Sequence, residues 1–151
     1  MKNNDAVAFT GDMKTRAEKF IEVFNKAPIA KSFGMTLTYD DAGRAVLHQP
    51  YNPDFNHGLG DVHGGVLATM IDNAGWFTAA LYYDTWINTV DLTVHMLEPA
   101  NSEALRAVGT IVRAGAHLAV TSMEVRSESG RLVATGCGTF SVSNIPFGSE
   151  K

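Results

Sequence analysis

One acidic residue, Asp72, lies inside an apolar run that begins with a His-Gly-Gly sequence, DVHGGVLATMIDNAG. Asp is a poor residue for the middle of a helix and is rarely buried without a partner. Gly75 nearby also costs a helix about 1 kcal/mol relative to Ala, and two unfavourable residues on one face suggest a cleft. A carboxylate there could act as a nucleophile or a general base. The structural alternative is an Asp paired with a core Arg or His.

The triplet His63-Gly64-Gly65 falls where the apolar helix should begin. Glycine lets the backbone approach a ligand closely, and the N–H groups of a first helical turn have no partner within the helix. These N–H groups also carry partial positive charge from the helix dipole. Such a donor can stabilise a developing oxyanion by about 3–4 kcal/mol. The triplet therefore indicates an anion-stabilising site at Gly64, with a plain tight turn as the structural alternative.

The spacing between these two features has a geometric consequence. Asp72 follows Gly64 by eight residues, which corresponds to about 12 Å along a helix axis. An attacking group and an oxyanion donor must both come within about 3 Å of one reacting centre. Two groups on one helix cannot do so. If both are catalytic, a two-fold axis must bring the Gly64 end of one helix to Asp72 of its mate, and two chains share each site.

Other polar residues near the run offer weaker signals. Asn56, in the loop before the helix, could donate an amide hydrogen bond to a substrate carbonyl or simply form a turn. Thr89 could orient a water molecule through its hydroxyl or be an ordinary strand residue. His57, Asp61 and His63 lie close together. They lack the ligand spacing and Cys pairs of zinc sites, so we expect no metal.

Periodicity predicts a single α+β domain over residues 1–151, in which these residues are positioned by helices and strands. A loose segment over 1–11 is followed by an amphipathic helix over 13–27. A DDAG turn predicts a hairpin over 35–50, and an apolar helix follows over 64–82. Because that helix is apolar on nearly every side, it needs a curved sheet wrapped around it. The expected strands of that sheet cover 87–97, 104–115, 118–127 and 132–143.

Composition narrows the class of protein. The chain has 151 residues, a net charge of −4 and one cysteine. A lone cysteine fits a reducing cytoplasm, and because the first residues lack an apolar run we expect no signal peptide. The sequence shows no basic stripe for nucleic-acid binding. Asp72 within the apolar run argues against a membrane span, because a charge in the bilayer is costly.

The motif as a whole, Asn56, Gly60, His63-Gly64-Gly65 and Asp72, resembles the hotdog-fold acyl-CoA thioesterases. The nearest branch is the PaaI-like, phenylacetyl-CoA type, which is related to the 4-hydroxybenzoyl-CoA thioesterases. The likeness continues through TVDLTVHMLEPA, VRAGAHLAVTSMEV and GRLVATGCGTFSV, and it covers roughly residues 28–143. The resemblance implies a long helix wrapped by an antiparallel sheet. It also implies homodimers or homotetramers built as pairs of dimers, with active sites between subunits.

The resemblance also implies a role for each motif residue. Asp72 would be the nucleophile or the general base, while the Gly64 N–H and Asn56 would polarise the thioester carbonyl. Thr89 would help to place water, and His63 would shape the loop. The implied reaction is hydrolysis of an acyl-CoA to a carboxylic acid and CoA. Coenzyme A is then part of the substrate, and no separate cofactor is expected.

Substrate contacts are expected around these residues. Small residues near Asp72, including Gly65 and Thr69, are expected to accommodate an aromatic or medium-chain acyl group together with Trp76 and Phe55. One departure from the family pattern is the spacing of the loop, where Asn56 lies one residue further from the His-Gly-Gly triplet than in close relatives.

A second departure concerns the grip on the CoA phosphates. Ala116 and His117 stand where many relatives carry Arg or Lys, so Arg113 and His117 are the remaining candidates for that contact. Two other functions stay open. One is a hotdog enoyl-CoA hydratase or dehydratase, which would need a His beside a carboxylate, with His57 and Asp72 as the available pair. The other is an acyl-CoA-binding module without catalysis.

Overall fold

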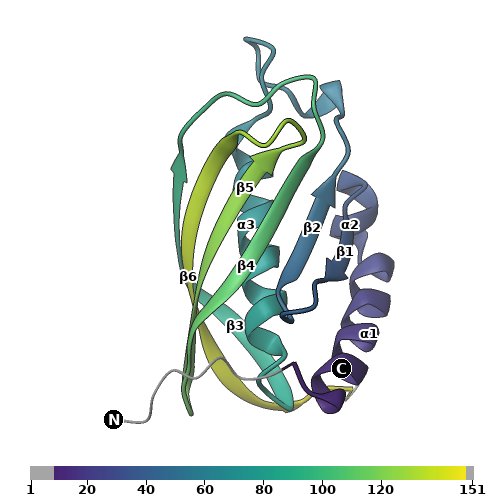
Figure 1. Cartoon of the computed structure of the whole chain (residues 1–151), viewed down its shortest axis with the longest axis vertical. Helices are drawn as coiled ribbons and strands as arrows, with labels where there is room; N and C mark the ends of the chain where they lie inside the picture. The colour runs from purple at the N-terminus through teal and green to yellow at the C-terminus, as the bar shows by residue number, and fades with distance from the viewer. Residues whose placement is uncertain (1–8, 149–151) are drawn as a thin grey trace.

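The computed structural model describes residues 9–148, and in it one antiparallel sheet curls around a long central helix (Figure 1). The prediction of a loose segment over 1–11 concerns mainly residues 1–8, which lie outside the described residues. The predicted hairpin, the central helix and the four strands expected after it are all present. The strands are β1 (Thr36–Tyr39), β2 (Ala45–Gln49), β3 (Thr85–Met96), β4 (Leu105–Ala114), β5 (Leu118–Ser127) and β6 (Leu132–Pro146).

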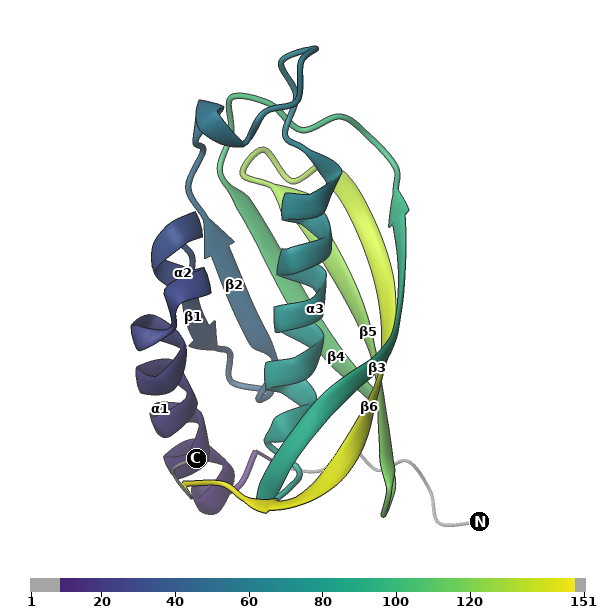
Figure 2. The same cartoon turned by 180° about the vertical axis from the view of Figure 1, so that it is seen from behind.

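The six strands form one sheet in the order β1-β2-β4-β5-β6-β3. Each neighbouring pair is antiparallel. The longest pairing joins β3 to β6, and these two strands twist around the central helix (Figure 2). The predicted α+β architecture, a long helix wrapped by a curved antiparallel sheet, is confirmed.

Two helices precede the sheet, where the sequence predicted one. Helix α1 (Gly11–Lys26) corresponds to the predicted helix over 13–27, and α2 (Pro28–Phe33) was not predicted. Ala27 is extended between them, Pro28 occupies the first turn of α2, and Gly34 ends it with a left-handed φ of 68°. A helix of six residues is too short to show a hydrophobic period, so only the proline at its start and the glycine at its end could have indicated it.

Helix α3 (Gly64–Ala80) lies against the inner face of the sheet (Figure 2). No helix within residues 9–148 has the length and apolar character needed to cross a membrane. Apolar side chains along this helix are buried, which explains why an apolar helix is stable here. They are Leu67, Met70, Ile71, Ala74, Phe77 and Leu81.

Two glycines mark close approaches between α3 and the sheet. A Cβ on Gly109 of β4 would come within 2.2 Å of the Ala74 carbonyl oxygen, and a Cβ on Gly75 within 2.7 Å of Thr121 Oγ1. The sequence had grouped Gly75 with Asp72 as two costly residues of one cleft. That grouping is wrong, because Gly75 is buried against β5 and is needed for packing on the sheet.

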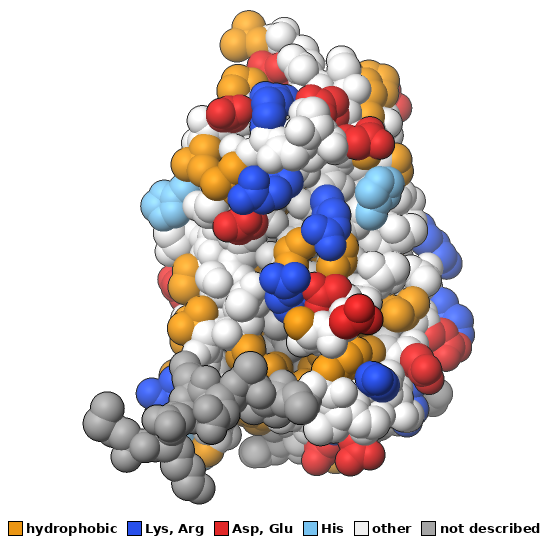
Figure 3. All heavy atoms as spheres, in the orientation of Figure 1, with side chains coloured by type: hydrophobic (Ala, Val, Ile, Leu, Met, Phe, Trp, Pro, Cys, Tyr) orange, Lys and Arg blue, Asp and Glu red, His pale blue; other side chains and the backbone are white. Residues whose placement is uncertain are grey.

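The outer face and one edge of the sheet are open to solvent. On the outer face, Lys and Arg side chains lie among Asp and Glu side chains (Figure 3), and Arg126 is 3.0 Å from Glu124. Strand β3 forms one edge of the sheet, and no strand within residues 9–148 pairs with its far side. We call this far side the β3 edge; Val90 and Met96 on this strand are exposed.

Candidate active site

Asp72 and Thr89 meet between α3 and β3. Asp72 is half-buried, and the Thr89 hydroxyl donates a hydrogen bond of 2.9 Å to Asp72 Oδ1. The pairing of β3 with β6 is irregular between Thr89 and Asp91. A bulge of this kind re-aims neighbouring side chains, so it helps to turn Thr89 toward the helix. The two residues, which the sequence singled out separately, are therefore one unit.

The surroundings of Asp72 change its acidity. Burial raises the pKa of Asp72, because a less polar environment disfavours the charged carboxylate. The hydrogen bond from Thr89 opposes this by lowering the pKa. Burial is the larger effect, so the net pKa lies above the ordinary value. A carboxylate with a raised pKa is a stronger base once it is ionised, which suits general-base chemistry.

The first turn of α3 presents backbone donors. The side chain of His63 caps the helix, with Nδ1 accepting a hydrogen bond of 2.9 Å from the Gly65 N–H. The His63 carbonyl accepts from the Val66 N–H at 2.9 Å. Within residues 9–148 the Gly64 N–H has no hydrogen-bond partner. The cap thus uses the N–H groups of the next two residues and leaves that of Gly64 available for a ligand.

A tightly bonded loop precedes this turn. The Asn56 amide nitrogen donates to the Gly60 carbonyl at 2.7 Å and to the Tyr51 hydroxyl at 3.0 Å. The His63 N–H donates to the Phe55 carbonyl at 2.9 Å. Donation from Asn56 to a substrate carbonyl would require exchange of one of its two loop bonds. The proposed role of Asn56 in polarising a carbonyl stays a prediction, and what the structure adds is its role in shaping the loop.

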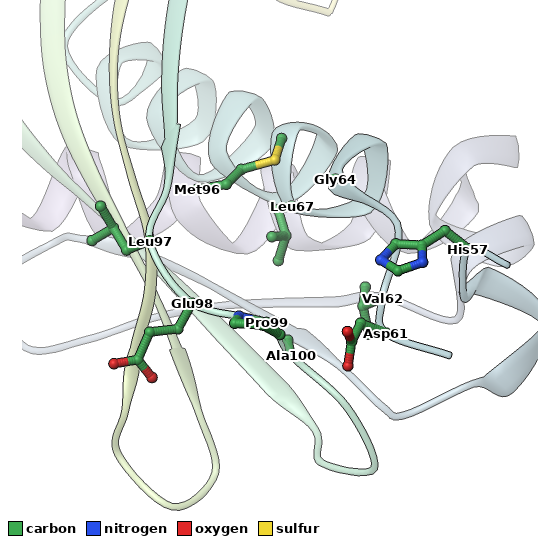
Figure 4. Close-up of a pocket in the computed structure, with 10 residues that line it drawn as sticks. All are labelled: His57, Asp61, Val62, Gly64, Leu67, Met96, Leu97, Glu98, Pro99 and Ala100. Atoms are coloured by element: carbon green, nitrogen blue, oxygen red, sulfur yellow. The ribbon is translucent and has the colours of Figure 1, made fainter. Parts of the chain in front are cut away.

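A pocket of about 280 Å³ opens beside Gly64 (Figure 4). Its walls come from the loop around His57 and Asp61, the first turns of α3, and the segment that leaves β3 at Met96. Asp72 is not among its lining residues. Gly64 and Asp72 belong to the same helix, about 12 Å apart along its axis. The single chain therefore holds the donor and the acid at separate places.

The predicted acyl-group residues on α3 have partners in the structure. Thr69 donates to the Gly65 carbonyl at 2.8 Å, so its hydroxyl is used within the helix. The Trp76 indole N–H donates to the Ile87 carbonyl at 3.0 Å. Trp76 also lies in an aromatic cluster with Trp86, at a ring distance of 5.7 Å. This half-buried cluster lies one helical turn beyond Asp72.

The remaining predicted contacts are spread over the molecule. Phe55 stacks on Phe33 of α2 with ring centres 4.9 Å apart, on the loop side of the molecule. Arg113 and His117 are exposed at the β4–β5 hairpin. This hairpin lies at the end of the sheet opposite the loop that precedes α3 (Figure 1). Within one chain, Arg113 and His117 are therefore not beside Gly64.

Sequence reasoning missed two residues near the helix start. Tyr51 receives the amide bond of Asn56, and its position at the start of the same loop was a signal that could have been used. Met96 lies beside Gly64 in the pocket (Figure 4). It comes from the far end of β3, and no local pattern links it to Gly64.

Comparison with known proteins identifies the family of this chain. Residues 59–134 match the family model of the thioesterase superfamily. A protein of Saccharolobus solfataricus, provisionally named an esterase, is 30% identical over 121 residues, which cover 79% of this chain and 86% of that protein. Acyl-coenzyme A thioesterase 13 of Homo sapiens is 25% identical over 134 residues, covering 86% of this chain and 89% of the relative.

Solved structures show the same fold. The E. coli PaaI protein, from the phenylacetic acid degradation operon, superposes with a TM-score of 0.80 at 20% identity, covering 89% of this chain and 96% of PaaI. At that identity the likeness concerns the fold. Sequence and fold together show that the chain belongs to the thioesterase superfamily and has the hotdog fold of its PaaI-like members.

Proposed function

We propose that this protein hydrolyses acyl-CoA thioesters to a carboxylic acid and free CoA, with Asp72 as the attacking or activating group. The observation that carries the proposal is the Asp72–Thr89 pair, a half-buried carboxylate with a raised pKa held by a 2.9 Å hydrogen bond. As a base, Asp72 would take a proton from water while the water oxygen attacks the carbonyl carbon. As a nucleophile, it would form an acyl anhydride that water then cleaves. In both routes the C–S bond breaks and the CoA thiolate leaves and is protonated.

The Gly64 N–H is the proposed oxyanion donor. It is free of protein partners within residues 9–148 and lies at the positive end of a 17-residue helix. A prearranged donor of this kind is most effective where charge develops in the transition state. His63 supports it by capping the helix, and Asn56 supports it by holding the loop.

The complete site requires two chains in this proposal. Gly64 and Asp72 are too far apart on α3 for one chain to use both, and the β3 edge is free to pair. Antiparallel pairing of two β3 edges about a two-fold axis would place the molecules head to tail. Gly64 of one chain would then approach Asp72 of the partner subunit. A pair of such dimers is compatible with this arrangement.

The same arrangement would gather the expected substrate contacts. In a head-to-tail pair, the β4–β5 hairpin with Arg113 and His117 lies at the same end as the Gly64 loop of its mate. These two residues are then available to the CoA phosphates. The aromatic cluster around Trp76 would offer an apolar surface to an aromatic or medium-chain acyl group.

Neither alternative function is favoured by an observation. A hydratase would need a free His beside Asp72, but Nδ1 of His57, the candidate, accepts a hydrogen bond of 3.1 Å from the Leu59 N–H. A binding module without catalysis would have no use for a carboxylate of raised pKa. Assaying enoyl-CoA hydration beside thiol release separates the first alternative from thioester hydrolysis.

Thiol release from a panel of acyl-CoA substrates tests the reaction and identifies the acyl group together. We expect Asp72→Asn to lower kcat/KM by at least ~100-fold, because it removes the main chemical group. Asp41→Asn, an exposed turn residue, is the matched control and should keep full activity. Unchanged turnover in a folded Asp72→Asn protein would exclude the assignment. Single-turnover hydrolysis in ¹⁸O-labelled water, with label sought in Asp72, distinguishes nucleophile from base.

A further inference from the structure

Met96 lies against the helix start that should bind the oxyanion. A Cβ built on Gly64 would come within 2.5 Å of both the sulfur and the terminal methyl of Met96. Both residues line the same pocket, and the Met96 side chain points from the strand toward the first turn of α3 (Figure 4). The thioether therefore fills the space that a side chain at position 64 would occupy.

The rest of the pocket is suited to a neutral group. Val62, Leu67 and Leu97 supply apolar walls, and no Lys or Arg of the described chain is among its lining residues. Its two carboxylates have partners of their own, since Asp61 accepts from Asn101 at 2.9 Å and Glu98 from Arg131 at 3.2 Å. Phosphate groups are disfavoured in such a pocket, whereas an uncharged chain would bury apolar surface there.

Met96 is also able to adjust its position. It is the last residue of β3 and its side chain is 55% exposed. Methionine is unbranched and has three rotatable bonds, so it can change shape without a change in the backbone. A carbonyl bound at the Gly64 N–H would have its substituent next to this thioether.

We infer that Met96 is a specificity-determining residue that limits the size of the acyl group admitted beside the Gly64 N–H. This inference rests on the proposed thioester hydrolysis. It adds a second residue from β3, after Thr89, to the proposed site. A larger side chain at position 96 would narrow the pocket, and a smaller one would widen it.

The first test compares Met96→Ala, Met96→Phe and wild type on acetyl-CoA and on a branched or aromatic acyl-CoA. The measured quantity is the ratio of kcat/KM for the bulky substrate to that for acetyl-CoA. We expect Met96→Ala to raise this ratio at least ~10-fold and Met96→Phe to lower it by a similar factor, since pocket contacts discriminate by such amounts. Val23→Ala, an apolar residue on α1 that is 40% exposed, should leave the ratio unchanged.

A second test uses the close approach directly. Gly64→Ala should lower kcat/KM because its new methyl group presses on the Met96 thioether. Adding Met96→Ala should restore at least half of the lost activity, because it clears that space. Such recovery is a non-additive effect that residues in contact show and distant residues do not.

The possible outcomes distinguish the role of Met96 from the proposed thioesterase activity. Ratios within about twofold of wild type for both Met96 variants, together with additive losses in the double variant, would overturn the role of Met96. That result in an active wild-type enzyme leaves the thioesterase proposal standing. Absence of thiol release from every acyl-CoA by the wild-type protein would instead overturn the proposed function itself.

Discussion

The first turn of α3 and its middle contribute chemistry of different kinds. At Gly64 the proposed catalytic group is the backbone N–H. Side chains contribute there by leaving this N–H accessible or by capping the helix. At Asp72 the useful group is a side chain, and its behaviour depends on burial and on Thr89 from a neighbouring strand. One helix thus offers a donor and an acid, neither of which forms a complete site alone.

The largest effect is expected from removing the backbone donor at Gly64 without removing a side chain. Gly64→Pro deletes the N–H, and proline is well tolerated at the first position of a helix. His63 already has φ −61° and ψ 136°, which the residue before a proline adopts readily. We expect kcat to fall about 100- to 1000-fold. Gly64→Ala, which adds the Cβ but keeps the N–H, is the control and should retain much more activity than the proline variant.

The same variant shows whether the two regions act across chains. If the chain forms the proposed dimer, a mixture of Gly64→Pro and Asp72→Asn proteins that is unfolded and refolded together would give mixed dimers with one intact site. Random pairing should restore about a quarter of wild-type activity if each site draws on both chains. A mixture as inactive as its two components would contradict a shared site.

The effect of Thr89 on the acidity of Asp72 can be tested by removing its hydroxyl. Thr89→Val removes the hydroxyl that lowers the pKa of Asp72. The pKa should then rise further, and the acidic limb of the kcat/KM profile should move to higher pH. We expect about a tenfold loss at neutral pH, from the lost hydrogen bond to a charged group. Thr89→Ser keeps the hydroxyl, and its pH profile should remain close to wild type; equal profiles for Val and Ser would remove Thr89 from the mechanism.

The smallest expected effect is on stability. Burial raises the pKa of Asp72 above its ordinary value of 3.8, so between those two values the folded chain binds more protons than the unfolded chain. Stability therefore falls as pH rises through this window and stays lowered above it. Asp72→Asn removes the penalty, and its Tm at pH 7 should exceed that of wild type. Thermal unfolding at pH 3, where the wild-type carboxyl is protonated in both states, should show little of this gain.

Much of the fold was predictable because the local hydrophobic periodicity of the sequence indicates its helices and strands. The apolar run of α3 and the alternating strands carry their own signals, and the DDAG turn set the hairpin. Helix α2 gave no periodic signal because it is so short. Gly75 was misassigned because a glycine required for packing on β5 and a glycine in a cleft have the same effect on helix propensity.

The candidate site, like the fold, has parts with a local sequence signal and parts without one. Asp72 and Gly64 could be singled out as candidates from sequence, because an acid in an apolar helix and glycines at its start are locally unusual. The bond between Thr89 and Asp72 depends on how β3 crosses α3. The engagement of both Asn56 amide protons within the loop depends on Tyr51 and Gly60. The position of Met96 beside Gly64 depends on where β3 ends, and single-sequence patterns contain none of these distances.

The open side of β3 also has a consequence for how the protein exists in a cell. A strand of 12 residues whose far side pairs with no other strand within residues 9–148 is a template for association, productive or otherwise. If mates bind there, mass action links folding to abundance, and stability becomes a property of the assembled pair. The amount of protein synthesised would then determine both the fraction that stays folded and the number of complete active sites.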